Sequence, residues 1–340
     1  MITTIKTETK DPHKKDTADQ NKGKLTRDAD GNWVLTKEVV AEEVNRKLEA
    51  ATSLDISIIA NLIAQSAIQL AQVGIRTARL DTELLLMSAL GVTREKLITK
   101  WTEHIHADQL ALFQQLLARR MKREPLAYIT GNKEFYGIKF LVDKRVLIPR
   151  PESELLIERT LHYVKQWEFG HDQLALVDVG TGCGNIAISI AKTANFVKIF
   201  ATDQSADALD VARINASLLS LDQNISFLKG DLLAPLPQPV NIIIANLPYI
   251  SEKRYAELEP EITMFEPEES LISGDDGLAH YRHLLAQTPQ FLLRNGIMLM
   301  EIDPEQVPAM RALVFKYLPQ STIEILQDGQ HLDRVVLVKA

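Results

Sequence analysis

Residues 242–249 read Ile-Ile-Ile-Ala-Asn-Leu-Pro-Tyr. The first four form a continuous apolar run, which is typical of a strand that is buried on both faces of a parallel sheet. The run stops at Asn246, so an amide, a proline turn and an aromatic ring follow at the carboxyl end of the strand. Open α/β sheets bind ligands beyond the carboxyl ends of their strands. This stretch therefore predicts the class of sheet and the position of its binding site.

Strand and helix patterns alternate around this stretch, from residue 153 to the C-terminus. The predicted strands lie at 174–179, 197–202, 225–228, 242–245 and 297–302, and the helices at 153–167, 185–192, 206–219, 284–293 and 307–317. Such alternation predicts an α/β fold with a parallel sheet and helices on both faces, which we assign to residues 153–340. Two final strands, 322–326 and 335–338, have no helix between them and predict an antiparallel hairpin at the sheet edge.

The first part of the chain divides into a polar extension and a helical region. Residues 1–31 contain almost no large apolar side chains, so we expect disorder there, with a helix near 36–51 in an extension of residues 1–53. Residues 54–130 show apolar stripes at helical spacing and predict a small bundle. Its helices are expected at about 56–73, 78–90, 94–100 and 107–120.

A predicted β-hairpin linker, residues 131–152, joins the bundle to the sheet. Aromatic and β-branched residues on both sides of Gly137 favour the hairpin. The linker ends in Pro149-Arg150-Pro151-Glu152, a stiff and extended connector. Two interpretations stay open for it. It can be a plain linker, or it can form a wall of the active site that holds Arg150 and Glu152.

Composition narrows the classes of function. The chain has 340 residues and a formal net charge of -7, which argues against a nucleic-acid partner. It has one cysteine, Cys183, which fits a reducing cytoplasm. There is neither an apolar signal core nor an apolar run of spanning length, so we expect a cytoplasmic protein without membrane contact. His104 and His106 have no acidic or cysteine cluster beside them, and we expect no metal site.

A glycine-rich loop, Gly-Thr-Gly-Cys-Gly at residues 180–184, follows the first predicted strand of the sheet. Its glycines permit a tight turn and the close approach of a ligand. No Gly-Lys-Ser/Thr follows, which excludes a P-loop, but the loop alone leaves a dinucleotide-binding fold open. Asp203 ends the second strand, where an acid can bind ribose hydroxyls, although it can also be a simple turn residue. The spacing of loop and acid favours ribose binding.

The tetrad Asn246, Leu247, Pro248 and Tyr249 separates the remaining possibilities. An amide or aromatic amine nitrogen is a poor nucleophile because its lone pair is delocalised. The side-chain oxygen of Asn246 and the backbone carbonyl of Leu247 can accept both N–H bonds and aim the lone pair at a methyl group. Pro248 fixes the turn, and Tyr249 can stack on a flat amide or base. Together the three motifs favour methyl transfer to a planar nitrogen over a strand that merely ends in a turn.

These motifs resemble those of class I S-adenosylmethionine-dependent methyltransferases. Four further segments narrow the resemblance to the HemK/PrmC family, the peptide chain release factor N5-glutamine methyltransferases. They are Arg-Glu-Pro at 123–125, Lys-Glu-Phe-Tyr-Gly at 133–137, Val-Leu-Ile-Pro-Arg-Pro-Glu at 146–152 and Asp-Arg-Val-Val at 333–336. The resemblance begins at about residue 56 and implies a helical N-terminal domain, a hairpin linker and a Rossmann-like domain with a seven-stranded sheet. It also implies that the substrate is the glutamine of the Gly-Gly-Gln motif in class 1 release factors, and that S-adenosyl-L-homocysteine is a product.

The resemblance implies roles for the site residues as well. Residues of the glycine loop surround the methionine part of the cofactor, and Asp203 binds its ribose. Asp231 and Leu232 border the adenine, and the tetrad holds the glutamine amide, with Asn246 close to the cofactor as well. The predicted loop residues are Gly180, Thr181, Gly182, Cys183 and Gly184.

One residue departs from the family pattern, because Leu247 stands where the family normally has a proline. The sequence Asn-Leu-Pro-Tyr is familiar from adenine-N6 methyltransferases that act on ribosomal RNA. The contact expected at this position is a backbone carbonyl, which leucine also has, so the chemistry is retained. The linker motifs and the acidic balance of the chain keep glutamine as the predicted substrate. The alternatives are an adenine-N6 methyltransferase acting on RNA or DNA, a glutamine methyltransferase acting on a ribosomal protein, and a non-catalytic binding protein. We also expect a monomer.

Overall fold

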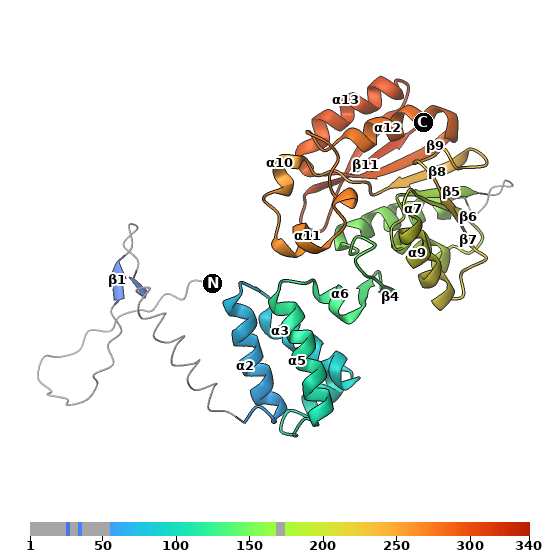
Figure 1. Ribbon diagram of the computed structural model, residues 1–340. Helices are drawn as coiled ribbons and strands as arrows, with labels where there is room; N and C mark the ends of the chain where they lie inside the picture. The colour runs from blue at the N-terminus through green and yellow to red at the C-terminus, as the bar shows by residue number, and fades with distance from the viewer. Residues whose placement is uncertain (1–24, 28–32, 36–54, 168–173) are drawn as a thin grey trace, which may run out of the picture.

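The computed structural model describes residues 25–27, 33–35, 55–167 and 174–340 (Figure 1). Strand β1 (Leu25–Arg27) pairs antiparallel with β2 (Trp33–Leu35). Leu25–Arg27 thus form a short strand within the extension that we expect to be largely disordered, with the β-forming residues of β2 as partner. The helix expected near residues 36–51 lies outside the described residues.

A helical bundle follows, with a hydrophobic core of its own. Its main helices are those that the sequence predicts: α2 (Ile59–Gln72), α3 (Ala78–Leu90), α4 (Arg94–Thr99) and α5 (Ala107–Met121). Their apolar stripes meet around fully buried side chains such as Leu70, Leu85 and Phe113. Gly91 caps α3 in the left-handed conformation, as a C-terminal glycine is expected to do. A short helix, α6 (Leu126–Thr130), was not predicted and leads out of the bundle.

The predicted hairpin comes next and connects the bundle to the sheet. Strand β3 (Asn132–Phe135) pairs antiparallel with β4 (Ile138–Leu141). Tyr136 and Gly137 have φ angles of 50° and 67°, which is the backbone that a tight two-residue hairpin turn needs. The chain then runs through a short 3₁₀ turn, η1 (Pro151–Ser153), into α7 (Glu154–Trp167).

The sheet has seven strands in the order β10-β11-β9-β8-β5-β6-β7. Strands β5 to β9 run parallel, and β11 runs antiparallel between β9 and β10. The chain passes from β5 outward to β7 and then returns to place β8 on the other side of β5, so the strand order reverses between β5 and β8. The strands are β5 (Ala175–Val179), β6 (Lys198–Asp203), β7 (Ile225–Lys229), β8 (Val240–Ala245), β9 (Leu292–Glu301), β10 (Thr322–Gln327) and β11 (Asp333–Lys339).

Helices cover both faces of this sheet (Figure 1). Ile242 and Ile244 of β8 belong to the core beneath α7, α8 and α9, whereas Ile243 and Ala245 belong to the core beneath α12 and α13. The strand is thus buried on both faces, as its apolar run predicts. The bounds of these covering helices are α8 (Asn185–Thr193), α9 (Ala206–Leu218), α12 (Ala279–Phe291) and α13 (Val307–Tyr317).

Two details differ from the predicted elements. The helix expected at 284–293 ends at Phe291, and β9 begins at Leu292 because that residue pairs with Val240 of β8. Gly296 consequently lies inside a strand, where a Cβ would come within 2.7 Å of the Asn241 carbonyl oxygen. Tertiary pairing therefore overrides the local helical pattern here.

An irregular segment between β8 and α12 was not predicted. It contains α10 (Glu252–Tyr255), α11 (Pro260–Phe265) and the 3₁₀ turn η2 (Glu268–Ser270). In Figure 1, α11 lies on the side of the sheet region that faces the helical bundle. The 3₁₀ turn η3 (Pro304–Gln306) connects β9 to α13, and β10 and β11 follow. No helix among the described residues has both the length and the apolar character needed to cross a membrane.

Candidate active site

The glycine loop and the tetrad meet where the strand order reverses. Val179 and Ala245 are paired across β5 and β8, so Gly180 and Asn246 follow neighbouring strand ends. Gly180 has a φ of 70°, and a Cβ there would lie 2.8 Å from Leu247 Cδ2. The positive φ favours glycine at this position, and a larger residue would displace the Leu247 side chain of the tetrad.

Asp203 ties the glycine loop to the end of β6. Its Oδ2 accepts a hydrogen bond from the Gly182 N–H at 2.9 Å, and its Oδ1 accepts one from the Ser205 N–H at 2.9 Å. Burial raises the pKa of this carboxyl group above its ordinary value. Gly182 has a φ of 55°, and the space that its Cβ would occupy is open. The loop thus leaves room for a ligand beside a partly buried acid.

One recess collects most of the residues that the sequence predicts for the cofactor. It lies over the carboxyl ends of β5, β6, β7 and β8. The predicted residues in its lining are Gly180, Gly182, Asp203, Asp231, Leu232, Asn246, Leu247 and Pro248. The rest of the lining consists of residues that were not predicted for the site: Arg145, Val146, Leu147, Thr202, Gln204, Ser205, Ala208, Gly230, Pro267, Glu269, Ser270 and His280. We call this hollow the first recess.

Three predicted loop residues shape the turn and are not among those lining the first recess. Thr181 donates its hydroxyl hydrogen bond to Asp178 at 2.7 Å. Cys183 is buried, and desolvation raises the pKa of its thiol to about 12. Gly184 is the N-cap residue of α8, and a Cβ on it would come within 2.9 Å of Ile188 Cδ1. Thr181 and Cys183 alternate with Gly180 and Gly182 and turn toward the protein core, whereas Gly184 packs against α8 and α9.

Asp178 is a buried acid inside β5 that sequence reasoning missed. It is 1% exposed, and its Oδ2 accepts bonds from the Thr181 hydroxyl and from the Ala187 N–H at 3.2 Å. Desolvation raises its pKa to about 6. The signal in the sequence was an aspartate within an otherwise apolar strand, which indicates a fixed partner. That partner is the glycine loop.

Asp231 and Leu232 lie at the end of β7, as predicted. Asp231 Oδ2 accepts a hydrogen bond from Gln287 Nε2 at 3.0 Å, and His283 Nε2 lies 3.5 Å away. Leu232 has a φ of 49°, an uncommon backbone for a leucine that turns the chain at the edge of the first recess.

A second recess adjoins the first one. Its lining consists of Leu147, Arg150, Asn246, Leu247, Pro248, Tyr249, Ile250, Ile262, Ser270, Leu271 and Glu301. Asn246, Leu247 and Pro248 line both recesses. The tetrad thus stands at the junction of two hollows, and two different molecules can meet there.

Hydrogen bonds from distant parts of the chain hold the tetrad. Asn246 Nδ2 donates to Ser153 Oγ at 2.8 Å, and Ser153 Oγ donates to Glu301 Oε2 at 2.6 Å. The Tyr249 hydroxyl donates to Glu301 Oε1 at 3.2 Å. Glu301 is 1% exposed, and desolvation raises its pKa to about 7.

The backbone of the tetrad is held as well. The Leu247 N–H donates to the hydroxyl oxygen of Tyr281 at 3.4 Å, and that hydroxyl donates to the backbone carbonyl of Glu301. Sequence reasoning singled out neither Ser153, Tyr281 nor Glu301. The local sequence does not distinguish Ser153 or Tyr281, and Glu301 shows only as an acid that follows the apolar run 297–300.

The connector before α7 contributes to the second recess. Arg150 lines it, and its guanidinium donates to the Glu266 carboxylate, which also accepts from the Ile148 N–H at 3.1 Å. Glu152 is not among the lining residues. Of the two interpretations of this connector, the structure places Arg150 in the wall of the recess. Among the described residues, no group of three or more His, Cys, Asp or Glu side chains is arranged to hold a metal ion.

Known proteins and families resemble this chain over most of its length. The family model described as PrmC N-terminal domain matches residues 61–131, and a model described as methyltransferase domain matches residues 170–301. The release factor glutamine methyltransferase of Bacillus anthracis is 32% identical over 260 residues, which are 76% of this chain and 91% of that protein. The protein of the same name from Geobacter sulfurreducens is 34% identical over 268 residues, which are 78% of this chain and 91% of that protein.

A relative from Deinococcus radiodurans with the same name is 34% identical over 252 residues, covering 74% of this chain and 88% of that protein. Among solved structures, a ribosomal protein L11 methylase from Lactobacillus delbrueckii subsp. bulgaricus matches with a TM-score of 0.41 and 20% identity, covering 58% of this chain and 83% of that one. That structural similarity is too weak to bear on function.

Proposed function

The chain belongs to the family of release factor glutamine methyltransferases, and on that premise we propose that it methylates the glutamine amide in the Gly-Gly-Gln motif of class 1 peptide chain release factors. One observation carries the proposal. Asn246 stands between the two recesses, with its side-chain NH₂ group bonded to Ser153. This arrangement leaves its oxygen Oδ1 as the atom that can accept a hydrogen bond from a substrate amide.

The first recess fits S-adenosylmethionine. That cofactor supplies an activated methyl group on a positively charged sulfur. Asp203 offers a carboxylate for the ribose hydroxyls, and Gly182 leaves open the space that a side chain would fill. Asp231 and Leu232 border the position proposed for the adenine. Nucleosides commonly bind at such a point, where the strand order of an open α/β sheet reverses.

The second recess receives the glutamine side chain in this proposal. Asn246 Oδ1 and the Leu247 carbonyl accept the two N–H bonds of the substrate amide, which fixes its plane and aims the nitrogen lone pair. Tyr249 provides an aromatic wall, held in place through its bond to Glu301. The nitrogen forms a bond with the methyl carbon while the carbon–sulfur bond breaks, its electron pair remains on sulfur, and the nitrogen releases one proton to water. The residues contribute position and exclusion of water.

Charge near the second recess favours a protein substrate over a nucleic acid. Residues 252–270 contain seven glutamates, one lysine and one arginine. Arg150, which lines this recess, is already bonded to Glu266. Three of these glutamates, Glu259, Glu261 and Glu266, are paired with arginines. The acidic excess of the other four repels phosphates, so the adenine-N6 alternative is disfavoured. We further propose a monomer that acts in the cytoplasm, where translation is terminated.

The test is incubation of the purified chain with labelled S-adenosylmethionine and three separate substrates: a class 1 release factor, ribosomal proteins and ribosomal RNA. Peptide mass mapping then locates the methyl group. We expect one methyl group on the Gly-Gly-Gln glutamine, and no label on a matched release factor whose glutamine is replaced by asparagine. Label found on RNA or on a ribosomal protein, with none on the release factor, would contradict the proposal.

A further inference from the structure

The side chain of Asn246 has two chemically different ends, and only one of them suits the proposed reaction. Its oxygen accepts hydrogen bonds, whereas its NH₂ group only donates them. A rotation of half a turn about the last side-chain bond exchanges the two ends. Methylation of an amide nitrogen therefore requires that something fixes this rotation.

Ser153 is placed to fix it. Ser153 is 1% exposed, and its Oγ lies 2.8 Å from Asn246 Nδ2 and 2.6 Å from Glu301 Oε2. A hydroxyl has a single proton, and an ionised carboxylate can only accept one. The Ser153 proton therefore points to Glu301, and the Ser153 oxygen can only accept a bond from Asn246. The NH₂ end of Asn246 is thus turned to Ser153, and its oxygen is turned to the other side.

We propose that Ser153 and Glu301 are positioning residues that hold Asn246 with its oxygen available to the substrate amide. This inference rests on the proposed function, since only an N–H-bearing substrate needs that orientation. The carboxylate sets the direction of the Ser153 hydroxyl, and the hydroxyl sets the orientation of the amide. Asn246 follows β8, Ser153 lies in the turn η1, and Glu301 ends β9. Ser153 is 93 residues from Asn246 and 148 residues from Glu301 along the chain.

The direction of these bonds depends on the ionisation of Glu301. Tyr249 donates to its carboxylate, and Tyr281 donates to its backbone carbonyl. Burial has the largest effect and raises the pKa of Glu301 to about 7, although the hydrogen bonds from Ser153 and Tyr249 lower it. Arg334 of β11 also lowers this pKa, and Glu152 of η1 raises it. A protonated Glu301 can donate to Ser153, whose own proton can then turn to the oxygen of Asn246. The competent orientation is therefore present above this pKa and is lost as the pH falls through it.

The experiment compares wild type with Ser153→Ala, with Ser153→Thr, which keeps a hydroxyl, and with Thr160→Val as a matched control. Thr160 lies in α7, the helix that follows Ser153, and it is 0% exposed. Its hydroxyl has no hydrogen-bond partner among the described residues, so the change to valine removes a buried hydroxyl that holds nothing in place. Three quantities are measured between pH 5.5 and 8.5: the single-turnover rate of methyl transfer to a release factor, the affinity for S-adenosylmethionine, and the chemical shifts of the Asn246 side-chain amide in protein labelled with ¹⁵N-asparagine.

We expect the wild-type rate to fall as the pH is lowered through about 7, and the Asn246 amide shifts to titrate with it. Ser153→Ala should be about tenfold slower or more at pH 8, because a positioning contact is lost. It should also lose both pH dependences and keep its cofactor affinity. Ser153→Thr should restore part of the rate, and Thr160→Val should match wild type.

A Ser153→Ala enzyme with the wild-type rate and pH profile, or with Asn246 shifts that still titrate, would overturn the inference. The amide shifts report on Asn246 without any reaction. If wild type transfers no methyl group to glutamine at any pH, the proposed function fails, while the titration of Asn246 still decides whether Ser153 and Glu301 control its side chain.

Discussion

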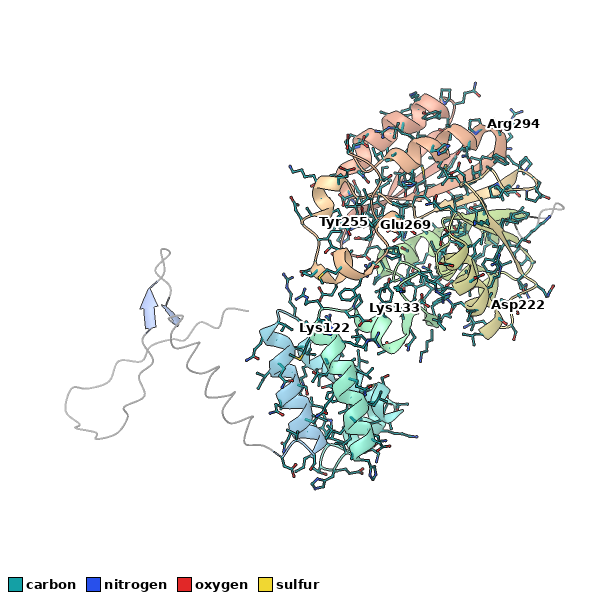
Figure 2. The ribbon with its side chains drawn as sticks, viewed as in Figure 1. Lys122, Lys133, Asp222, Tyr255, Glu269 and Arg294 are labelled. Carbon is teal, nitrogen blue, oxygen red and sulfur yellow. The ribbon has the colours of Figure 1, made fainter. Side chains whose placement is uncertain are left out.

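The guanidinium of Arg120 in α5 lies 3.1 Å from the carboxylate of Glu261 in α11. Its Nε also donates to Asp81 of α3 at 2.7 Å, and the Arg120 side chain is only 7% exposed. Arg123 adds a second ion pair to Glu261. The next residue of α11, Ile262, lines the second recess. The helical bundle is therefore joined through buried and partly buried charges to a wall of the proposed substrate site, in the region between Lys122 and Tyr255 in Figure 2.

Replacing Arg120 with alanine should destabilise the protein strongly. The change leaves Asp81 without its buried cation and weakens the neutralisation of Glu261, and breaking a buried pair in this way typically costs about 3–5 kcal/mol. Denaturant unfolding measures the effect. Arg213→Ala is the control, because Arg213 and Asp210 form an exposed pair in α9, which should contribute about 1 kcal/mol or less. Equal losses in the two variants would show that the Arg120 pairs do not stabilise the fold.

Gly182→Ala should separate cofactor binding from folding. A methyl group at this position meets no protein atom but enters the first recess, and the φ of 55° strains any residue other than glycine. We expect a loss of about 1–2 kcal/mol in stability from the backbone and a loss of about tenfold or more in affinity for S-adenosylmethionine. Calorimetry measures the affinity.

Gly137→Ala is the matched control for that variant, since Gly137 has a φ of 67° in the hairpin turn and open space around its Cβ position. It should show a similar loss of stability and an unchanged affinity. If both variants bind the cofactor like wild type, the first recess is not its site.

Burial of Asp178 should make stability depend on pH in a defined window. The pKa of this carboxyl rises from 3.8 to about 6 on folding, so the folded state holds its proton more tightly than the unfolded chain. Its contribution to stability is therefore complete below pH 4 and is lost as the pH rises through 6. Between pH 4 and 7, the free energy of unfolding of wild type should fall by roughly 2–3 kcal/mol more than that of Asp178→Asn. Parallel curves for the two proteins would refute this account of Asp178.

The sequence predicts much of the fold because the relevant patterns are local. The apolar runs of the buried strands, the alternation with helices and the glycine loop can each be recognised within a few residues. Asn246 and Asp203 were predicted together because both end parallel strands, and the reversal of strand order then brings β8 and β6 to either side of β5. The spacing of apolar residues could not reveal α10 and α11. These helices have four and six residues, which are too few to show a helical stripe.

The residues that support Asn246 could not be predicted from the sequence for a different reason. Ser153 is an ordinary residue at a helix start, and Glu301 is an ordinary end to a strand. Their significance comes from contacts with Asn246 and with each other over long separations in the sequence. Thr181, Cys183 and Gly184 were placed around the cofactor because glycine loops contact ligands, but local spacing does not say which of its residues face inward.

The most direct test of the account is the single-turnover rate of methyl transfer by Asn246→Ala to a class 1 release factor, with the affinity for S-adenosylmethionine measured in parallel. Asn241→Ala is the control, because Asn241 lies toward the opposite end of the same strand and bonds to the Ala175 N–H. We predict that Asn246→Ala folds and binds the cofactor but transfers the methyl group about a hundredfold more slowly, since it loses the group that orients the amide. Transfer by Asn246→Ala at the wild-type rate would contradict the account.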